Sequence, residues 1–363
     1  METGSDSRHS ESNAPPPARW LIRIAETFAD KSREILERLG SGSVTKLGNE
    51  YYLIKTDRPP DIHGPDAGMY VQWSIPVEHS WPCCPQEMEG FIEKAAQALW
   101  RKFGPRNPQS ILMGQLHPGS PLKYYRTLAS NLRGRTLQLF PPLRAASAEA
   151  QDSLAESLFC LVGSEGLFCG MCSPRRANGF YPGGTKYIRQ NTPDTISRAG
   201  AKIAEALHYL LLYRAAIPAG CHWLELGASP GGMTSELLAR GYRVTAVDRA
   251  PLDKRLERHA GLTFLCADAA AFHPPKGMHY DALLSDLNGD ARDSMGHVIR
   301  AAQHLNPGGM VIFTLKLAGA ETPGETITLF QSVVDIAAGA GLSLLARTHL
   351  TYNRQEFTLF FRT

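Results

Sequence analysis

The second half of the chain alternates between short apolar runs and segments whose apolar residues recur at helical spacing. Buried strands are predicted at 222–226, 243–247, 262–266, 280–285, 309–315, 342–347 and 356–362. Helices are predicted between them at 199–214, 232–240, 295–305 and 324–340. This alternation is typical of a doubly wound α/β domain over 199–363, whose ligand lies at the carboxyl ends of the strands.

The first half of the chain predicts two smaller α+β units. The first covers 18–66, with strands at 18–25 and 51–55 around a helix, and ends in a segment rich in proline and glycine. The second covers 67–174. A linker over 175–198 follows, and residues 1–17 are polar and expected to form a disordered tail.

Composition and charge narrow the functional classes. Of the 363 residues 43% are hydrophobic, and 38 basic against 35 acidic residues give a net charge of +3, so any basic site must be local. Seven cysteines are too few for a disulfide framework. Because no apolar run approaches the ~20 residues of a membrane span and the first residues do not look like a signal peptide, we expect a cytoplasmic protein without a membrane segment.

The predicted linker combines cationic and aromatic side chains. Its basic residues are Arg175, Arg176, Lys186 and Arg189, and its aromatic residues are Phe180, Tyr181 and Tyr187. Phosphate contacts together with stacking faces are the mixture that proteins use to bind single-stranded nucleic acid. The alternative is a solvated interdomain linker.

A glycine-rich turn follows the first strand of the α/β domain, in the segment Glu225-Leu-Gly-Ala-Ser-Pro-Gly-Gly232. This spacing is not the G-x-G-x-x-G of dinucleotide enzymes. Asp248 ends the next strand and can accept hydrogen bonds from the ribose hydroxyls of a nucleoside cofactor; otherwise it is a solvated strand end. Asp268 follows the third strand and is a candidate acceptor for an adenine amine, or else a helix N-cap.

Four charged residues stand where the predicted elements converge. Lys202 lies in the helix before the first strand, Asp286 and Lys316 end two strands, and Glu356 begins the last strand. A lysine at the end of an apolar strand is costly unless it is paired or extends to solvent, and extension to solvent is the alternative interpretation of Lys316.

These motifs resemble a known family. The turn resembles the S-adenosylmethionine loop of Rossmann-fold methyltransferases related to FtsJ, and Lys202, Asp286, Lys316 and Glu356 resemble the Lys-Asp-Lys-Glu tetrad of ribose 2′-O-methyltransferases. The segments at 197–202 and 353–356 resemble the flanks of that tetrad in the ribosomal RNA large subunit methyltransferase M family. Residues 158–174 are similar to the last strands of the THUMP domain in the same family.

The resemblance implies an order of domains and a reaction. A ferredoxin-like domain (18–66) and a THUMP-like RNA-binding domain (67–174) would precede a Rossmann-fold methyltransferase domain (199–363). The implied reaction is methylation of a ribose 2′-hydroxyl, on a cytidine of large-subunit (23S) ribosomal RNA, without a metal. The implied cofactor, S-adenosylmethionine, would be bound by Glu225, Gly227, Ala228, Ser229, Pro230, Gly231, Gly232, Asp248, Asp268 and Asp286.

The expected chemistry is removal of one proton from the hydroxyl while the methyl group is displaced in line. Lys316 would accept this proton if Lys202 and desolvation lower its pKa, with Asp286 and Glu356 orienting the amines. The alternatives are methylation of another RNA, a small-molecule or protein methyltransferase, a non-catalytic RNA-binding protein and a nicotinamide-dependent oxidoreductase. We expect no metal or redox role for the C-x-x-C pair Cys169 and Cys172.

Overall fold

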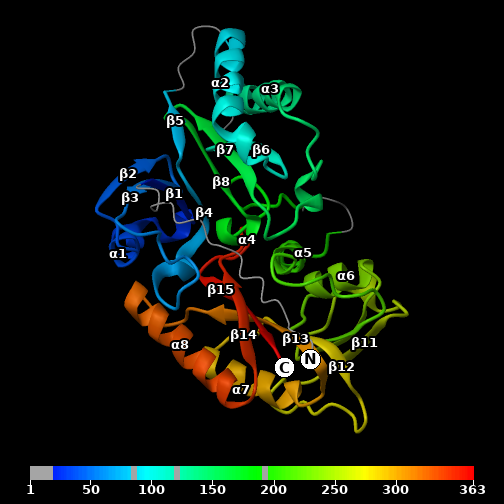
Figure 1. Cartoon of the computed structure of the whole chain (residues 1–363). Coiled ribbons are helices and arrows are strands. Elements are labelled where there is room, and N and C mark those ends of the chain that lie inside the picture. The colour runs from blue at the N-terminus through cyan, green and yellow to red at the C-terminus, as the bar shows by residue number, and fades with distance from the viewer. Residues whose placement is uncertain (1–18, 83–87, 118–122, 190–194) are drawn as a thin grey trace, which may run out of the picture.

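The computed structural model describes residues 19–82, 88–117, 123–189 and 195–363, which form three β-sheets with helices packed against them (Figure 1). The tail predicted for residues 1–17 lies outside the described residues.

The first sheet is antiparallel. Its order is β2 (Ser43–Leu47), β3 (Tyr51–Lys55), β1 (Arg19–Ile24) and β4 (Val71–Pro76). The 3₁₀ helix η1 (Glu26–Lys31) and α1 (Ser32–Arg38) connect β1 to β2, and η2 (Ala67–Tyr70) precedes β4. This is the strand order of a ferredoxin-like βαββαβ unit in which η2 replaces the second helix. Because β4 pairs with β1, the sheet runs past residue 66, where the sequence predicted a boundary.

The second sheet has the order β5 (His79–Trp81), β8 (Gly166–Cys172), β7 (Ser157–Gly163) and β6 (Ile111–Gln115). Strands β6 and β7 are parallel, and the other pairs are antiparallel. Helices α2 (Met88–Phe103) and α3 (Lys123–Leu139) cover one face, where their apolar residues join those of the strands in one cluster.

The third sheet has seven strands in the spatial order β11 (Leu262–Cys266), β10 (Arg243–Asp248), β9 (His222–Leu226), β12 (Tyr280–Ser285), β13 (Leu305–Lys316), β15 (Glu356–Arg362) and β14 (Ser343–Thr348). The first five are parallel, and β15 runs antiparallel between β13 and β14. Strand order reverses between β9 and β12. The crevice at their carboxyl ends is therefore the expected ligand site of such a sheet.

Helices cover both faces of this sheet (Figure 1). Helices α5 (Ala199–Leu210) and α6 (Gly232–Ala239) pack on one face, and α7 (Ala291–Ala302) and α8 (Pro323–Gly339) pack on the other. The predicted fold class, a Rossmann-fold domain preceded by α+β units, is confirmed. The helix predicted to reach residue 214 ends at Leu210, after which the chain forms a turn.

The predicted linker is folded for much of its length. It begins with the short helix α4 (Pro174–Ala177), whose N-cap Ser173 accepts a hydrogen bond from the Arg176 amide. Phe180 is buried in the cluster that contains the apolar face of α5. The segment therefore packs against the C-terminal domain, and Phe180 is not available to stack on a base.

Candidate active site

The glycine-rich turn follows β9 at the point where strand order reverses. Gly227 and Gly231 have φ values of 81° and 103°, a region that side chains rarely adopt. A Cβ atom on Gly227 would lie 3.0 Å from the backbone oxygen of Asp286, and one on Gly232 would collide with the Ser197 hydroxyl. Within the turn, Ala228 is buried, Ser229 half-buried and Pro230 exposed.

A cleft of about 400 Å³ opens beside this turn. Gly227, Ser229 and the backbone and side chains after β10, β11 and β12 line it. Five carboxylates line it: Asp248, Asp268, Asp286, Asp290 and Asp293. The basic residues of the lining are Arg249 and His297. The surplus of negative charge favours a cationic ligand and disfavours one that carries phosphates.

The predicted ribose ligand Asp248 is bonded to the turn itself. Its Oδ2 accepts a hydrogen bond from the Ser229 amide at 2.9 Å, and its Oδ1 accepts one from the Ala250 amide at 2.8 Å. Asp268 lines the same cleft after the neighbouring strand β11, and its Oδ1 accepts a hydrogen bond from the Ala270 amide at 2.8 Å within a turn rather than a helix. Backbone amides therefore hold both carboxylates in the lining of the cleft.

Glu225 lies beneath the turn rather than in the lining of the cleft. It is buried, and the Thr234 hydroxyl of α6 donates to its Oε2 at 2.7 Å. Burial raises the pKa of Glu225 to about 8. The side chain is therefore largely neutral at pH 7 and joins β9 to the first turn of α6.

The four predicted tetrad residues meet in a closed ring of alternating charge. Lys202 Nζ lies 2.6 Å from Glu356 Oε1 and 3.2 Å from both oxygens of Asp286. Lys316 Nζ lies 2.6 Å from Glu356 Oε2 and 2.8 Å from Asp286 Oδ1. Each lysine thus contacts both carboxylates, and Lys316 does not extend to solvent alone.

The ring is partly shielded from water, because its side chains are only 10–21% exposed. Burial disfavours the charged form of Lys316, but the carboxylates of Asp286 and Glu356 outweigh it and raise its pKa above the usual 10.5. The condition set for Lys316, a pKa lowered by Lys202 and desolvation, is therefore not met in this ring. The two acids lie between the lysines and stabilise the ammonium that Lys202 was expected to destabilise.

Asp286 belongs to both parts of the site. It lines the cleft beside the glycine-rich turn and also contacts both lysines of the ring. Whatever occupies the end of the cleft near Asp286 therefore lies next to the ring.

Asn353, within the flank at 353–356, and Tyr352, which the sequence did not single out, make contacts beside Glu356. The Asn353 side chain donates to the Glu356 backbone oxygen at 3.2 Å. The Tyr352 hydroxyl accepts from the Ile188 amide at 2.9 Å and donates to the Ile188 carbonyl at 3.1 Å. These contacts attach the end of the linker to the segment that carries Glu356.

The four basic linker residues fall into two places. Lys186 lies half-buried beside α5, 3.4 Å from His208 Nδ1, and Arg189 is exposed a few residues later. Arg175 packs on the ring of Tyr213, at the turn that follows α5, and Arg176 is exposed beside it. Tyr187, 70% exposed, is the most accessible of the linker aromatics.

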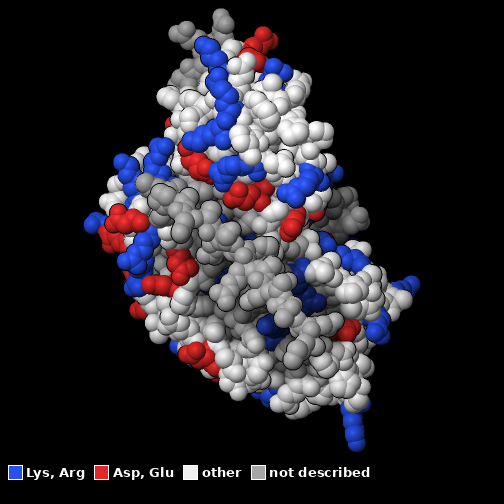
Figure 2. Space-filling view, viewed as in Figure 1, with Lys and Arg blue, Asp and Glu red and all other residues white. Residues whose placement is uncertain are grey.

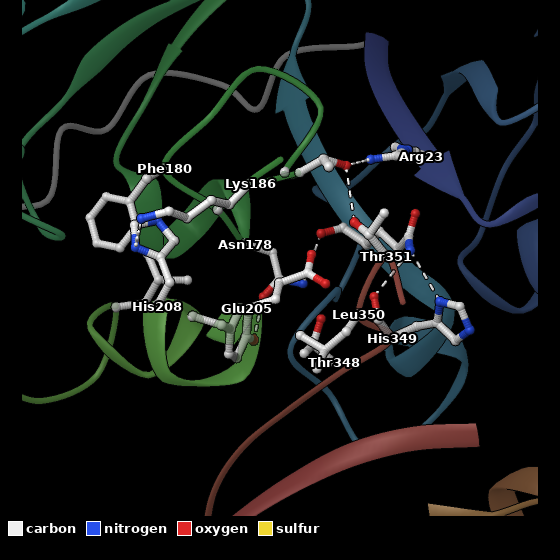
Figure 3. Close-up of a pocket in the computed structure, with 16 residues that line it drawn as sticks. Arg23, Asn178, Phe180, Lys186, Glu205, His208, Thr348, His349, Leu350 and Thr351 are labelled. Atoms are coloured by element: carbon white, nitrogen blue, oxygen red, sulfur yellow. Dashed lines mark hydrogen bonds between the residues drawn. The ribbon is translucent and has the colours of Figure 1, made fainter. Parts of the chain in front are cut away.

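A second, much smaller pocket lies between the first sheet, the linker and α5 (Figure 3). In this view Glu205 and His208 project from α5 while Arg23 comes from β1. Its volume of about 20 Å³ suffices for about one water molecule. Burial raises the pKa of Glu205 to about 7 and lowers that of His208 to about 4. The pocket is too small for a nucleotide, so the acidic cleft is the candidate ligand site.

The C-x-x-C pair lies in a strand of the second sheet. Cys169 and Cys172 are buried in β8, where burial raises the pKa of both thiols. Among these residues no group of three or more histidine, cysteine or carboxylate side chains could hold a metal ion. None of the described helices has the length and apolar character needed to cross a membrane.

The chain is similar to proteins named ribosomal RNA large subunit methyltransferase M. It is 32% identical to the one from Halorhodospira halophila over 251 residues, covering 68% of each chain. It is 30% identical to the one from Teredinibacter turnerae over 207 residues, 55% of this chain and 57% of that relative. The matched part thus spans about three fifths of that relative's length.

Among solved structures, TrmN from Thermus thermophilus aligns over 95% of this chain and 99% of its own, at 15% identity and a TM-score of 0.38. A structure titled as a hemolysin from Lactococcus lactis covers 47% of this chain and 89% of its own, at 20% identity and a TM-score of 0.41. No family model matches the chain.

Proposed function

The chain belongs to the ribosomal RNA large subunit methyltransferase M family, and we propose from this premise that it transfers a methyl group from S-adenosylmethionine to a ribose 2′-hydroxyl of RNA. We propose a cytidine of large-subunit (23S) ribosomal RNA as the target and the cytoplasm as the place of action. The observation that carries the proposal is the position of Asp286, which joins the acidic cleft to the ring of two lysines and two carboxylates.

The residues present fit the cofactor. Gly227 lies too close to the Asp286 backbone to carry a side chain. Because this residue of the cleft lining has none, a ligand can lie against the backbone of the turn. Carboxylates at Asp248 and Asp268 offer acceptors for hydroxyl and amino groups, and the acidic lining suits a sulfonium cation. When bound, S-adenosylmethionine supplies an electrophilic methyl group.

In this proposal Gly227 to Gly232 and Asp248 hold the cofactor, with Glu225 acting from beneath the turn through Thr234. Asp268 contacts the base of the cofactor, and Asp286 faces its charged end. The same lining disfavours a nicotinamide dinucleotide, whose two phosphates would meet five aspartates.

The ring supplies the proton acceptor. Lys316 has to be neutral before it can accept the proton of the 2′-hydroxyl at Nζ, and its two carboxylate partners oppose this. A positive charge in the cleft competes with Lys316 for Asp286 and so lowers the pKa of the lysine. Lys202 and Glu356 keep the ring closed and hold Lys316 in its orientation. Alignment of the two reactants accounts for the remainder of the rate enhancement.

The experiment that tests this function separates binding from transfer. Lys316→Ala should abolish methyl transfer to ribosomal RNA while its affinity for S-adenosylmethionine, measured by calorimetry, stays within about twofold, because the lost interaction belongs to the transition state. Lys276→Ala, which changes an exposed lysine after β11, is the matched control and should be fully active. Near-normal transfer by Lys316→Ala would contradict the proposed role.

A further inference from the structure

A groove of about 510 Å³ lies away from the ring, between α4, the turn after α5 and the edge strand β14. Its guanidinium groups come from two distant parts of the chain, Arg175 and Arg176 in α4 and Arg347 in β14, and His63 lies beside them. No aspartate or glutamate is among the described residues that line it. The groove therefore concentrates guanidinium groups without opposing charge on its walls.

The charge of Arg347 has no bonded carboxylate among the described residues. Its Nη1 donates to the His63 carbonyl at 2.9 Å and its Nη2 donates to the Gly64 carbonyl, while its buried Nε has no partner. Asp61 acts on Arg347 electrostatically but lines a different pocket. Carbonyl oxygens orient this guanidinium without neutralising it.

Arg175 packs on an aromatic ring at the same groove. The centre of its guanidinium lies 4.7 Å from the centroid of the Tyr213 ring, a cation–π contact that does not require an N–H donor. Arg176 is exposed beside it. A planar guanidinium with free edges binds phosphate oxygens in pairs, a geometry that a lysine cannot match.

The groove is related to the ring through α5. Lys202 lies near the start of this helix, Lys186 approaches it at His208, and Arg175 contacts Tyr213 just after its end. Lys202 and Leu210, the last residue of α5, are eight positions apart, or roughly 12 Å along the helix axis, and Tyr213 lies in the turn that follows. At ~3.4 Å per stacked nucleotide the helical part alone corresponds to about three or four nucleotides. Figure 1 shows α4 beside the end of α5.

We propose that this groove binds backbone phosphates of the RNA substrate several nucleotides from the reacting ribose. The inference rests on the proposed function. It assigns the four basic residues of the linker to two separate RNA contacts. Lys186 and Arg189 contact the RNA near the ring, while Arg175 and Arg176 act together with Arg347. In this arrangement the groove determines how far along the strand the target nucleotide lies.

The test uses the full chain and a 20-nucleotide single-stranded RNA of mixed sequence. Arg175→Gln combined with Arg176→Gln should weaken binding and reduce the slope of log affinity against log salt by up to ~1.4, since each lost phosphate contact on a single strand contributes about 0.7. The matched control is Arg258→Gln with Lys276→Gln, two exposed cations flanking β11 at the opposite edge of the seven-stranded sheet. It should keep the wild-type slope.

Arg176→Glu serves as a second variant, because this exposed side chain can be reversed in charge without disturbing the core. It should weaken RNA binding further, with S-adenosylmethionine affinity unchanged. A wild-type salt slope in both variants would overturn the inference. If the variants lost binding of inorganic phosphate while the salt dependence of their RNA affinity stayed unchanged, the groove would be a site for a free anion. That result would overturn the inference too.

Methyl transfer by the wild-type protein distinguishes failure of the proposed function from failure of the groove. Absence of methyl transfer by the wild-type protein would contradict the proposed function. Normal transfer and normal RNA affinity in the groove variants, with an active wild type, would contradict only the groove.

Discussion

At the level of single residues, the two carboxylates of the ring determine the protonation of Lys316. Both lie within 2.8 Å of its Nζ. Their attraction exceeds the cost of burial and raises the pKa of Lys316, so the lysine holds its proton near neutral pH. The proposed base therefore works only after that proton has left.

This leads to a prediction about the pH dependence of the rate. At saturating cofactor and RNA, transfer should rise with pH from 6 to 9, by as much as about tenfold per pH unit, as Lys316 loses its proton. Glu356→Gln removes one negative charge and lowers the pKa of Lys316, which should move the profile to lower pH even if the maximum rate falls. The control Glu321→Gln changes an exposed carboxylate and should leave the profile in place. A flat profile shared by all three proteins would contradict the role of Lys316.

Glu225 gives a prediction about stability. Its pKa of about 8 in the folded protein lies above the ~4.3 of an unfolded chain. The folded state therefore keeps a proton that the unfolded state has lost, and stability falls as the pH rises from about 4.3 to 8. Between pH 6 and 8 the free energy of unfolding of Glu225→Gln, relative to wild type, should rise by about 1–3 kcal/mol. Urea unfolding at each pH measures these free energies, and Glu257→Gln, at an exposed carboxylate, is the control. If the free energy of Glu225→Gln relative to wild type did not change between pH 6 and 8, Glu225 would be ionised in the folded protein.

The sequence predicted which residues gather at the site, because strand ends and the helix before β9 place Lys202, Asp286, Lys316 and Glu356 at one edge of the sheet. It could not predict the pKa of Lys316. That depends on distances of a few ångströms from Lys316 to Asp286 and Glu356, which lie 30 and 40 positions away along the chain, and spacing along a strand does not determine these distances.

At the level of elements, α5 carries Lys202 and packs closely on α6. A Cβ atom on Gly200 would lie 2.9 Å from the backbone oxygen of Gly232, the residue that ends the glycine-rich turn. The position of Lys202 and the position of the turn are therefore linked by a contact that only glycine allows.

Gly200→Ala should separate α5 from α6 by a few tenths of an ångström and reduce turnover and cofactor affinity together. Gly296→Ala in α7 is the matched control, because nothing lies within 4 Å of its Cβ position. It should stabilise the protein by up to about 1 kcal/mol without changing turnover. Turnover, cofactor affinity and thermal unfolding are measured for both variants. Equal turnover and equal cofactor affinity in the two would show that the α5–α6 contact does not determine activity.

Element positions in the C-terminal domain were predicted closely, since strands β9 and β15 match the apolar runs at 222–226 and 356–362. The first half was harder. Strand β2 was missed because most of its residues are exposed and show no apolar alternation. The α4 turn and the buried Phe180 were also missed, since their burial depends on contacts with α5 rather than on local pattern.

At the level of the whole molecule, the first sheet and the seven-stranded sheet share one apolar cluster. Phe28 stacks on Phe357 with ring centroids 5.5 Å apart and lies 5.0 Å from both Tyr70 and His349. Phe357 adjoins Glu356 of the ring. The sequence predicted the order of the units but not this interface, which no motif encodes. On the face shown in Figure 2, basic and acidic side chains are interspersed rather than separated.

Phe28→Ala should cost about 3–5 kcal/mol of stability and also lower turnover, because it removes support from the segment that holds Glu356. Phe103→Ala, fully buried in the cluster between α2 and the second sheet, should cost a similar amount but leave transfer from folded protein unchanged. Chemical unfolding measures the stability of the two variants. Turnover, measured well below the unfolding transition, distinguishes them. Equal turnover in the two variants would contradict a coupling between the first sheet and the ring.

The most direct test of the central claim is the chemical position of the transferred methyl group. The purified full-length protein is incubated with methyl-labelled S-adenosylmethionine and ribosomal RNA from cells that lack its gene, and the RNA is then hydrolysed in alkali. A 2′-O-methyl group blocks cleavage of the adjoining phosphodiester, so we expect the label in alkali-stable dinucleotides, with none after reaction with Lys316→Ala. Label on mononucleotide bases, or no incorporation by the wild-type protein, would contradict the account.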